Sequence, residues 1–205
     1  WDDPNFPNIE GFGVWAAKCN FTMGPDGKMY SRMLGGNLVR IDVENARGEN
    51  LTNGDLVGTK DGSAYGLVFG PQDENVFYFS NNDKHCIYKY DLRTKECACW
   101  AGQEGKSGYL DGPIGQAMFN KPGQMCVDSE GNIILTDTEN HCIRKITMST
   151  GYVSTLAGKP QNSGYVNGSA EDAQFKKPLG ICIDNDDVMY IGDSENRAIR
   201  RLAVE

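Results

Sequence analysis

Cysteine and histidine are the residues of this chain best suited to metal or redox chemistry, with seven of the first and two of the second. Cys97-Ala98-Cys99 places two thiols on one face of an extended strand. A zinc site needs three or four converging ligands, however, and the sequence offers no further ligand beside this pair. Because the cysteine count is odd, at least one cysteine is unpaired within the chain. We therefore predict no metal site.

Two short motifs resemble nucleotide and calcium sites but lack essential parts. Gly105-Lys106-Ser107 matches the end of a Walker A loop, yet Trp100 stands where the first glycine is required and no helix is expected to follow. The acidic run 184–187 lacks the glycine and the distal glutamate of an EF-hand loop. Neither H-E-x-x-H nor G-x-S-x-G occurs. We therefore predict no catalytic residue and no cofactor.

The overall charge excludes several partners. The 205 residues carry a formal net charge of −8, which disfavours nucleic acid and anionic membrane surfaces. No apolar run approaches the roughly 18 residues of a membrane span, so no membrane insertion is expected. The chain opens on Trp1, and we expect it to be processed, trimmed or a piece of a longer protein, with the loss of a targeting segment left open.

An internal repeat organises the second half of the chain. Residues match at an interval of 56 positions with no insertion or deletion. The matches include Gly108-Tyr109-Leu110-Asp111-Gly112 with Gly164-Tyr165-Val166-Asn167-Gly168, Phe119 with Phe175, Cys126-Val127-Asp128 with Cys182-Ile183-Asp184, and His85-Cys86-Ile87 with His141-Cys142-Ile143. So many matches in one register indicate a repeated structural unit.

Each unit is expected to fold as four short strands. In the best-defined copy, the strands are predicted at 124–128, 133–136, 142–147 and 152–157, separated by turn-forming Gly, Asn, Ser and Thr. Four antiparallel strands per unit of this length are typical of a β-propeller blade. We predict an all-β fold in which residues 1–205 form one propeller domain, or its C-terminal part. The blades are expected at roughly 19–58, 64–101, 122–158 and 178–205.

The repeat resembles the NHL repeat. Its typical pattern matches residues 178–184, 131–137, 140–145 and 193–201, with good specificity over 64–205 and only faintly over 19–58. The resemblance implies a six-bladed propeller in most cases. Since the last unit lacks a fourth strand, we expect these blades to be the C-terminal part of a larger propeller, with a closed four-bladed ring as the alternative.

The loop between the units adds a second likeness. Its Gly-Tyr-x-Asp-Gly…Ala-x-Phe pattern is similar to that of secreted bacterial NHL proteins, some of which carry an IPT/TIG domain before the propeller. This resemblance implies a periplasmic or cell-surface location.

The repeat also assigns the reactive side chains to blade positions. Cys126 matches Cys182, and Cys86 matches Cys142, as residues that pack in the core would do. The two histidines share one position in adjacent blades, which places them too far apart to share an ion. Packing is therefore the favoured role for these residues.

One face of the predicted propeller collects polar and tyrosine side chains. The loops between second and third strands and the long connections between blades are expected on this face, around a central depression. We predict a ligand site there, formed by Asn81, Asn82, Tyr109, Asp111, Asp137, Tyr165, Asn167 and Asp193. For the two aspartates, a structural role in capping loop amides is the alternative.

These features lead to three hypotheses for function. The leading one is a non-catalytic binding module that presents this face to a glycan, peptide or protein. The second is a hydrolase or lyase of propeller type, with an active site at the channel mouth completed by N-terminal blades missing from this sequence. The third is a rigid spacer in a cell-surface protein.

Overall fold

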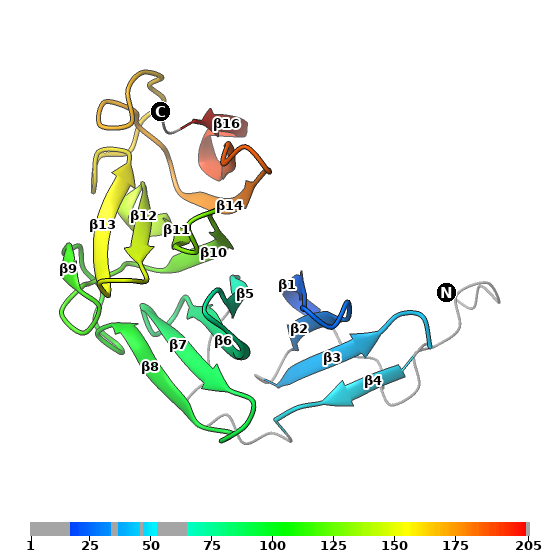
Figure 1. The fold of residues 1–205 in the computed structure, drawn as a ribbon. Coiled ribbons are helices and arrows are strands. Elements are labelled where there is room, and N and C mark those ends of the chain that lie inside the picture. The colour runs from blue at the N-terminus through cyan, green and yellow to red at the C-terminus, as the bar shows by residue number, and fades with distance from the viewer. Residues whose placement is uncertain (1–16, 34–36, 46, 53–64, 204–205) are drawn as a thin grey trace.

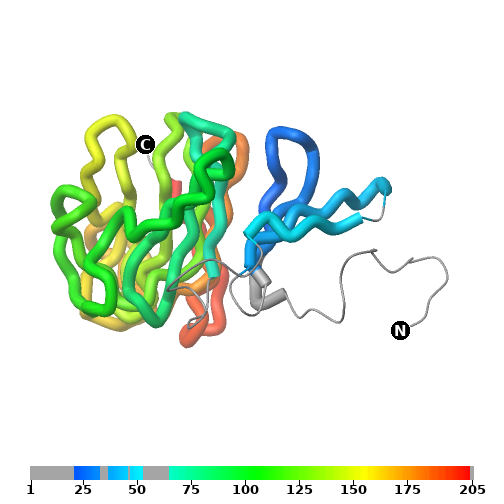
Figure 2. Tube along the Cα trace, turned by 90° about the horizontal axis from the view of Figure 1, so that it is seen from below, coloured from blue at the N-terminus to red at the C-terminus, as the bar shows by residue number. Residues whose placement is uncertain are grey.

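A computed structural model describes residues 17–33, 37–45, 47–52 and 65–203. This part of the chain consists of antiparallel β-sheets joined by loops and two short 3₁₀ turns, which confirms the all-β fold. The sheets follow one another around an arc, in the manner of propeller blades (Figure 1). Seen from the side, the strands run between two faces of the molecule (Figure 2).

Four sheets make up the arc, and we number them blades 1 to 4 in chain order. Blade 1 contains β1 (Ala17–Met23), β2 (Met29–Met33), β3 (Leu38–Asp42) and β4 (Arg47–Asn50). Blade 2 contains β5 (Leu67–Gly70), β6 (Asp73–Asn81), β7 (Cys86–Asp91) and β8 (Cys97–Gly102). Blade 3 contains β10 (Pro122–Val127), β11 (Ile133–Asp137), β12 (Cys142–Thr147) and β13 (Tyr152–Ala157), with the short β9 (Gly112–Pro113) on its outer edge. Blade 4 contains β14 (Pro178–Ile183), β15 (Met189–Asp193) and β16 (Ala198–Leu202).

The hairpin turns follow from the residues that the repeat places there. Between β10 and β11, Gly131 adopts a φ of +80°, and the Asp128 carboxylate accepts a hydrogen bond of 2.7 Å from the backbone N–H of Asn132. Between the second and third strands, the turns η1 (Thr138–Asn140) and η2 (Ser194–Asn196) each end in a left-handed residue, His141 or Arg197. The same local chemistry therefore recurs in successive blades.

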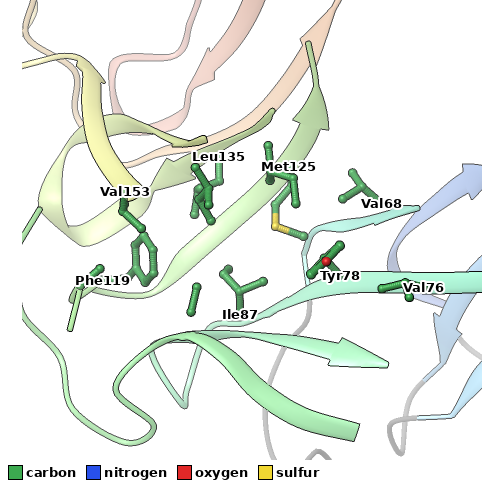
Figure 3. Close-up of a cluster of buried hydrophobic side chains, with 12 residues drawn as sticks. Val68, Val76, Tyr78, Ile87, Phe119, Met125, Leu135 and Val153 are labelled. Carbon is green, nitrogen blue, oxygen red and sulfur yellow. The ribbon is translucent and has the colours of Figure 1, made fainter. Parts of the chain in front are cut away.

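The core lies between the blades. The interface of blades 2 and 3 packs Ile87 and Tyr78 against Leu135 and Met125, and Phe119 of the connecting loop closes it (Figure 3). Similar clusters fill the interfaces of blades 1 and 2 and of blades 3 and 4. Since each fully buried large apolar side chain contributes about 1.5–3 kcal/mol, these interfaces are the main source of cohesion. The blades thus act as rigid supports for the loops at their ends.

Candidate functional site

The long connections between blades lie on the same face as η1 and η2. The side-chain amide of Asn140 donates to the carbonyl oxygen of Gly108 at 2.8 Å, and Asn196 donates to Gly164 at 2.7 Å. Gly108 in the connection 103–121 and Gly164 in the connection 158–177 are therefore held against the ends of the second and third strands. We call this end of the arc the loop face.

A buried arginine anchors the first of these connections. The Arg144 guanidinium lies 2.6 Å from a carboxylate oxygen of Asp137 and 2.6 Å from one of Asp111. It also donates to the carbonyl oxygens of Leu110 at 2.9 Å and Met118 at 3.1 Å. Four oxygen acceptors, three from the connection and one from β11, thus converge on one fully buried side chain.

Two aromatic rings enclose the same guanidinium. Its central carbon lies 4.8 Å from the ring centre of Tyr109 and 5.1 Å from that of Phe119. The Tyr109 hydroxyl is 2.7 Å from the hydroxyl of Thr155, which fixes the orientation of the tyrosine. The arrangement combines ion pairing with cation–π contact in a site shielded from water.

Blade 4 repeats the anchor with one change. Arg200 pairs with Asp193 at 2.9 Å and lies between Tyr165 and Phe175, whose ring centres are each 5.0 Å from the guanidinium carbon. Asn167 replaces the second carboxylate and accepts from Arg200 at 2.7 Å. The two Arg-centred clusters are therefore structural copies that differ by one charge.

Burial and charge act in opposite directions on these groups. Burial raises the pKa of Asp137 to about 6, although the Arg144 guanidinium, the Asn140 side chain and the Asn120 backbone N–H work to lower it. Burial works to lower the pKa of Arg144, but its acidic partners, Asp137 first, leave that pKa raised. The arginine is charged at any ordinary pH.

The predicted ligand residues divide into three groups in the structure. Tyr109, Asp111 and Asp137 come together around Arg144, and Tyr165, Asn167 and Asp193 come together around Arg200. Asn81 and Asn82 belong instead to the end of blade 2, where they bond to the backbone of Lys84 and Lys121. The set thus covers the loop face without forming one cluster.

Exposure separates the surface members of this set from the buried ones. Asp137 and Asp193 are completely buried and accept hydrogen bonds from the backbone of Asn120 and Lys176. Tyr165 is 62% exposed, and Asn167 lies on the surface beside it. Tyr109 and Asp111 are half-buried. The aspartates thus support the loops, while the tyrosines and Asn167 are available at the surface.

A small cavity opens beside Tyr109. Its volume is about 400 Å³, and Thr155, Lys159 and Glu171 also line it. An aromatic face and groups of both charges therefore surround this space, which lies between the two connections.

A larger hollow runs along the inner strands of all four blades. Its volume is about 870 Å³, and β1, β5, β10 and β14 supply most of its mainly apolar lining. At the loop face it adjoins a space of about 270 Å³ lined by Tyr65, Gln124, Leu179, Gly180 and Ser194. We call these five residues the channel mouth. Sequence reasoning did not group these five residues, because they come from three blades and meet only in the assembled fold.

Both histidines accept hydrogen bonds from the backbone just before the first strand of the next blade. Nδ1 of His85 accepts a hydrogen bond from the N–H of Lys121 at 3.0 Å, and Nδ1 of His141 accepts one from Lys177 at 3.2 Å. Each histidine therefore fixes the start of the next blade. Among the described residues, no three His, Cys, Asp or Glu side chains are grouped so as to hold a metal ion.

Known proteins share both the repeat and the fold. The NHL repeat model matches residues 119–146. A structure from Bacteroides thetaiotaomicron, of a protein of unknown function, is 28% identical with a TM-score of 0.82, covering 90% of this chain and 46% of that chain. An auxiliary nutrient binding protein of the same organism is 29% identical with a TM-score of 0.70, covering 89% of this chain and 46% of that chain.

A curated relative extends the likeness to plants. The chloroplastic protein SUPPRESSOR OF QUENCHING 1 of Arabidopsis thaliana is 29% identical over 173 residues, which is 80% of this chain and 16% of that protein. The chain thus spans a small part of this relative and about half of the two solved structures. The repeat match and the blade geometry together support an NHL-repeat β-propeller.

Proposed function

We propose that this propeller is a non-catalytic binding module that presents its loop face to a glycan, peptide or protein. The observation that carries the proposal is the pair of Arg-centred clusters. They hold Tyr109 and Tyr165 at the surface on rigid supports, which lowers the entropy cost of using these rings in binding. Aromatic rings beside amide and carboxylate groups suit sugars and peptides alike.

The channel mouth adds a concave surface to this face. Tyr65 and Ser194 contribute hydroxyl groups, and Gln124 is oriented by a hydrogen bond of 2.9 Å from the backbone of Ile181. Ligand sites characteristically place a small number of polar groups in fixed positions over an apolar cavity. The auxiliary nutrient binding protein, 29% identical to this chain, supports a ligand of nutrient type.

We further propose a periplasmic or cell-surface location, on the basis of the likeness to these Bacteroides proteins. No helix in the described part of the chain is long and apolar enough to cross a membrane.

The four blades are also proposed to belong to a larger propeller. Ile134 and Ile143 of blade 3 are buried against blade 4. Their counterparts 56 residues later, Tyr190 and Ile199, are 39% and 75% exposed on the other side of blade 4. Because the same repeat positions form a blade interface one step earlier, a further blade is the occupant that this apolar face fits best.

Binding is tested with glycan and peptide arrays, followed by affinity measurements on the compounds that bind. Tyr165→Ala should weaken binding by several-fold to about tenfold, as expected for loss of an aromatic contact. Tyr152→Ala is the matched control, because Tyr152 is 47% exposed but lies in β13 beside the turn at the opposite end of blade 3. A second variant, Tyr65→Ala, tests the channel mouth in the same way.

The outcomes separate the hypotheses. Binding that depends on Tyr165 or Tyr65 but not on Tyr152 supports the module. Turnover of an array compound would contradict it and favour the hydrolase or lyase. Absence of binding to every glycan and peptide would favour a spacer. On that hypothesis the three substitutions change the stability of the protein and no other property.

A further inference from the structure

Blade 2 lacks the Arg-centred cluster of the later blades. Asn81 stands where blade 3 has Asp137, and Tyr88 stands where it has Arg144. At the neighbouring position of the outer strand, Cys99 replaces Thr155, the residue that bonds to Tyr109 and Asp111 in blade 3. At the positions of Asp137, Arg144 and Thr155, blade 2 therefore carries an asparagine, a tyrosine and a cysteine.

The strand register brings two of these thiols together. Tyr88 of β7 lies opposite Cys99 of β8, and Cys86 lies opposite Gly102, with a bulge between the two pairs. Cys86 and Tyr88 are two residues apart and point to the same face of the sheet. Cys86 is thus the diagonal neighbour of Cys99 across the strands, and both side chains belong to the core cluster between blades 1 and 2.

The two thiols differ in access and in charge. Cys86 is completely buried in the core between blades 1 and 2, whereas Cys99 is half-buried at its margin. The neighbouring Cys99 side chain and burial both raise the pKa of Cys86, and the neighbouring Cys86 side chain lowers the pKa of Cys99. Cys99 is therefore the thiol that a reagent meets first, and Cys86 is the protonated thiol behind it.

We propose that Cys86 and Cys99 form a redox-active pair, which a small-molecule disulfide converts reversibly into a cross-strand disulfide. The Cys99 thiolate attacks one sulfur of the reagent, forms a mixed disulfide and releases one thiolate. The Cys86 thiol then gives up its proton and attacks Cys99 Sγ, releasing the second reagent thiol. Two protein thiols are oxidised, and one reagent disulfide is reduced to two thiols.

The other cysteines near this pair are poor substitutes. Cys97 lies two residues from Cys99 on the same strand, too far along an extended backbone for the two to bond. Cys142, the repeat counterpart of Cys86, has Thr155 where blade 2 has Cys99. Cys142 therefore provides a control at the same blade position without a partner thiol.

The test is peptide mapping of the full chain after incubation with oxidised glutathione. After acid quenching, alkylation and trypsin digestion, we expect a disulfide between peptides 85–89 and 96–106, which Lys84, Lys89, Lys95 and Lys106 delimit. The link should be lost in Cys86→Ser and Cys99→Ser and kept in Cys142→Ser and Cys97→Ser. Cys86→Ser should instead accumulate glutathione on Cys99.

Three results would overturn the proposal. They are complete alkylation of both thiols after oxidation, a stable glutathione adduct on Cys99 of the unsubstituted protein, and a link that requires Cys97. Circular dichroism establishes that each variant is folded. If Cys86→Ser does not fold, Cys86→Ala provides the same comparison, because it removes the sulfur without placing a hydroxyl in the core.

Discussion

Asp137 and Arg144 form an ion pair of 2.6 Å in which neither side chain is exposed, and Asp193 and Arg200 repeat it at 2.9 Å one blade later. Burying two charges is expensive, so such a pair contributes less to stability than its short distance suggests. The geometry of the pair indicates a positioning role. Because Arg144 also bonds to the carbonyl oxygens of Leu110 and Met118, it ties a long connection to the end of its blade.

Removing one partner of this pair should be strongly destabilising. Asp137→Asn leaves the Arg144 guanidinium buried with one fewer charged acceptor, and we expect a loss of about 3–5 kcal/mol in the free energy of unfolding. Urea denaturation provides the measurement. Glu130→Gln is the control, since the Glu130 side chain is 74% exposed and should change stability by less than about 0.5 kcal/mol. Equal effects of the two substitutions would contradict a structural role for the pair.

The repeat allows isoleucine at one repeat position to be tested in two environments. Ile143 is completely buried between blades 3 and 4, whereas Ile199, at the same repeat position, is 75% exposed. Ile143→Ala should therefore cost about 2–5 kcal/mol, and Ile199→Ala less than about 0.5 kcal/mol. Thermal and urea unfolding would measure both.

The same two substitutions, Ile143→Ala and Ile199→Ala, test whether a further blade covers blade 4. In a longer form of the protein that contains such a blade, the cost of Ile199→Ala should rise toward that of Ile143→Ala. If the cost stays small there, the outer face of blade 4 is not a blade interface.

The strands were predictable because the 56-residue repeat and the alternation of apolar and polar residues indicate the same strand boundaries. The third and fourth strands of blade 3 occupy 142–147 and 152–157, as the turn residues between them indicate. The buried role of Arg144 was missed, because in an alternating strand a charged residue is expected to face solvent. A signal existed: blade 2 replaces aspartate and arginine together, by Asn81 and Tyr88. The channel mouth had no such signal, because its residues meet only when the blades assemble.

Acid should weaken the hairpin between β10 and β11. Burial works to raise the pKa of Asp128, but hydrogen bonds from Asn132 and Lys145 outweigh it and leave that pKa lowered. The Asp128 carboxylate therefore binds a proton less readily in the folded state than in the unfolded chain, where the pKa of aspartate is about 3.9. The stabilisation is complete above that pH and is lost as the pH falls through the lower, folded value.

The measurement compares urea midpoints of the protein and of Asp128→Asn at pH 7 and near pH 3. The variant should be the less stable at pH 7, and the difference should shrink at the acidic pH. A difference that is the same at both pH values would show that the charge of Asp128 is not what stabilises the turn. Asp187→Asn is a useful comparison, because Asp187 is half-buried and accepts a hydrogen bond from the backbone N–H of the nearby turn residue Ser129.

Two cysteines at one repeat position should react at very different rates. Burial raises the pKa of Cys126 to about 12, so almost none of it is thiolate at neutral pH, whereas its counterpart Cys182 is exposed on blade 4. Since the thiolate is the nucleophile, iodoacetamide should label Cys182 early and Cys126 only slowly or after unfolding. Mass spectrometry of timed samples measures the order, and Cys182→Ser removes the early product. If Cys126 is labelled as fast as Cys182, burial does not suppress the Cys126 thiolate, which would contradict close packing of blades 3 and 4 around this residue.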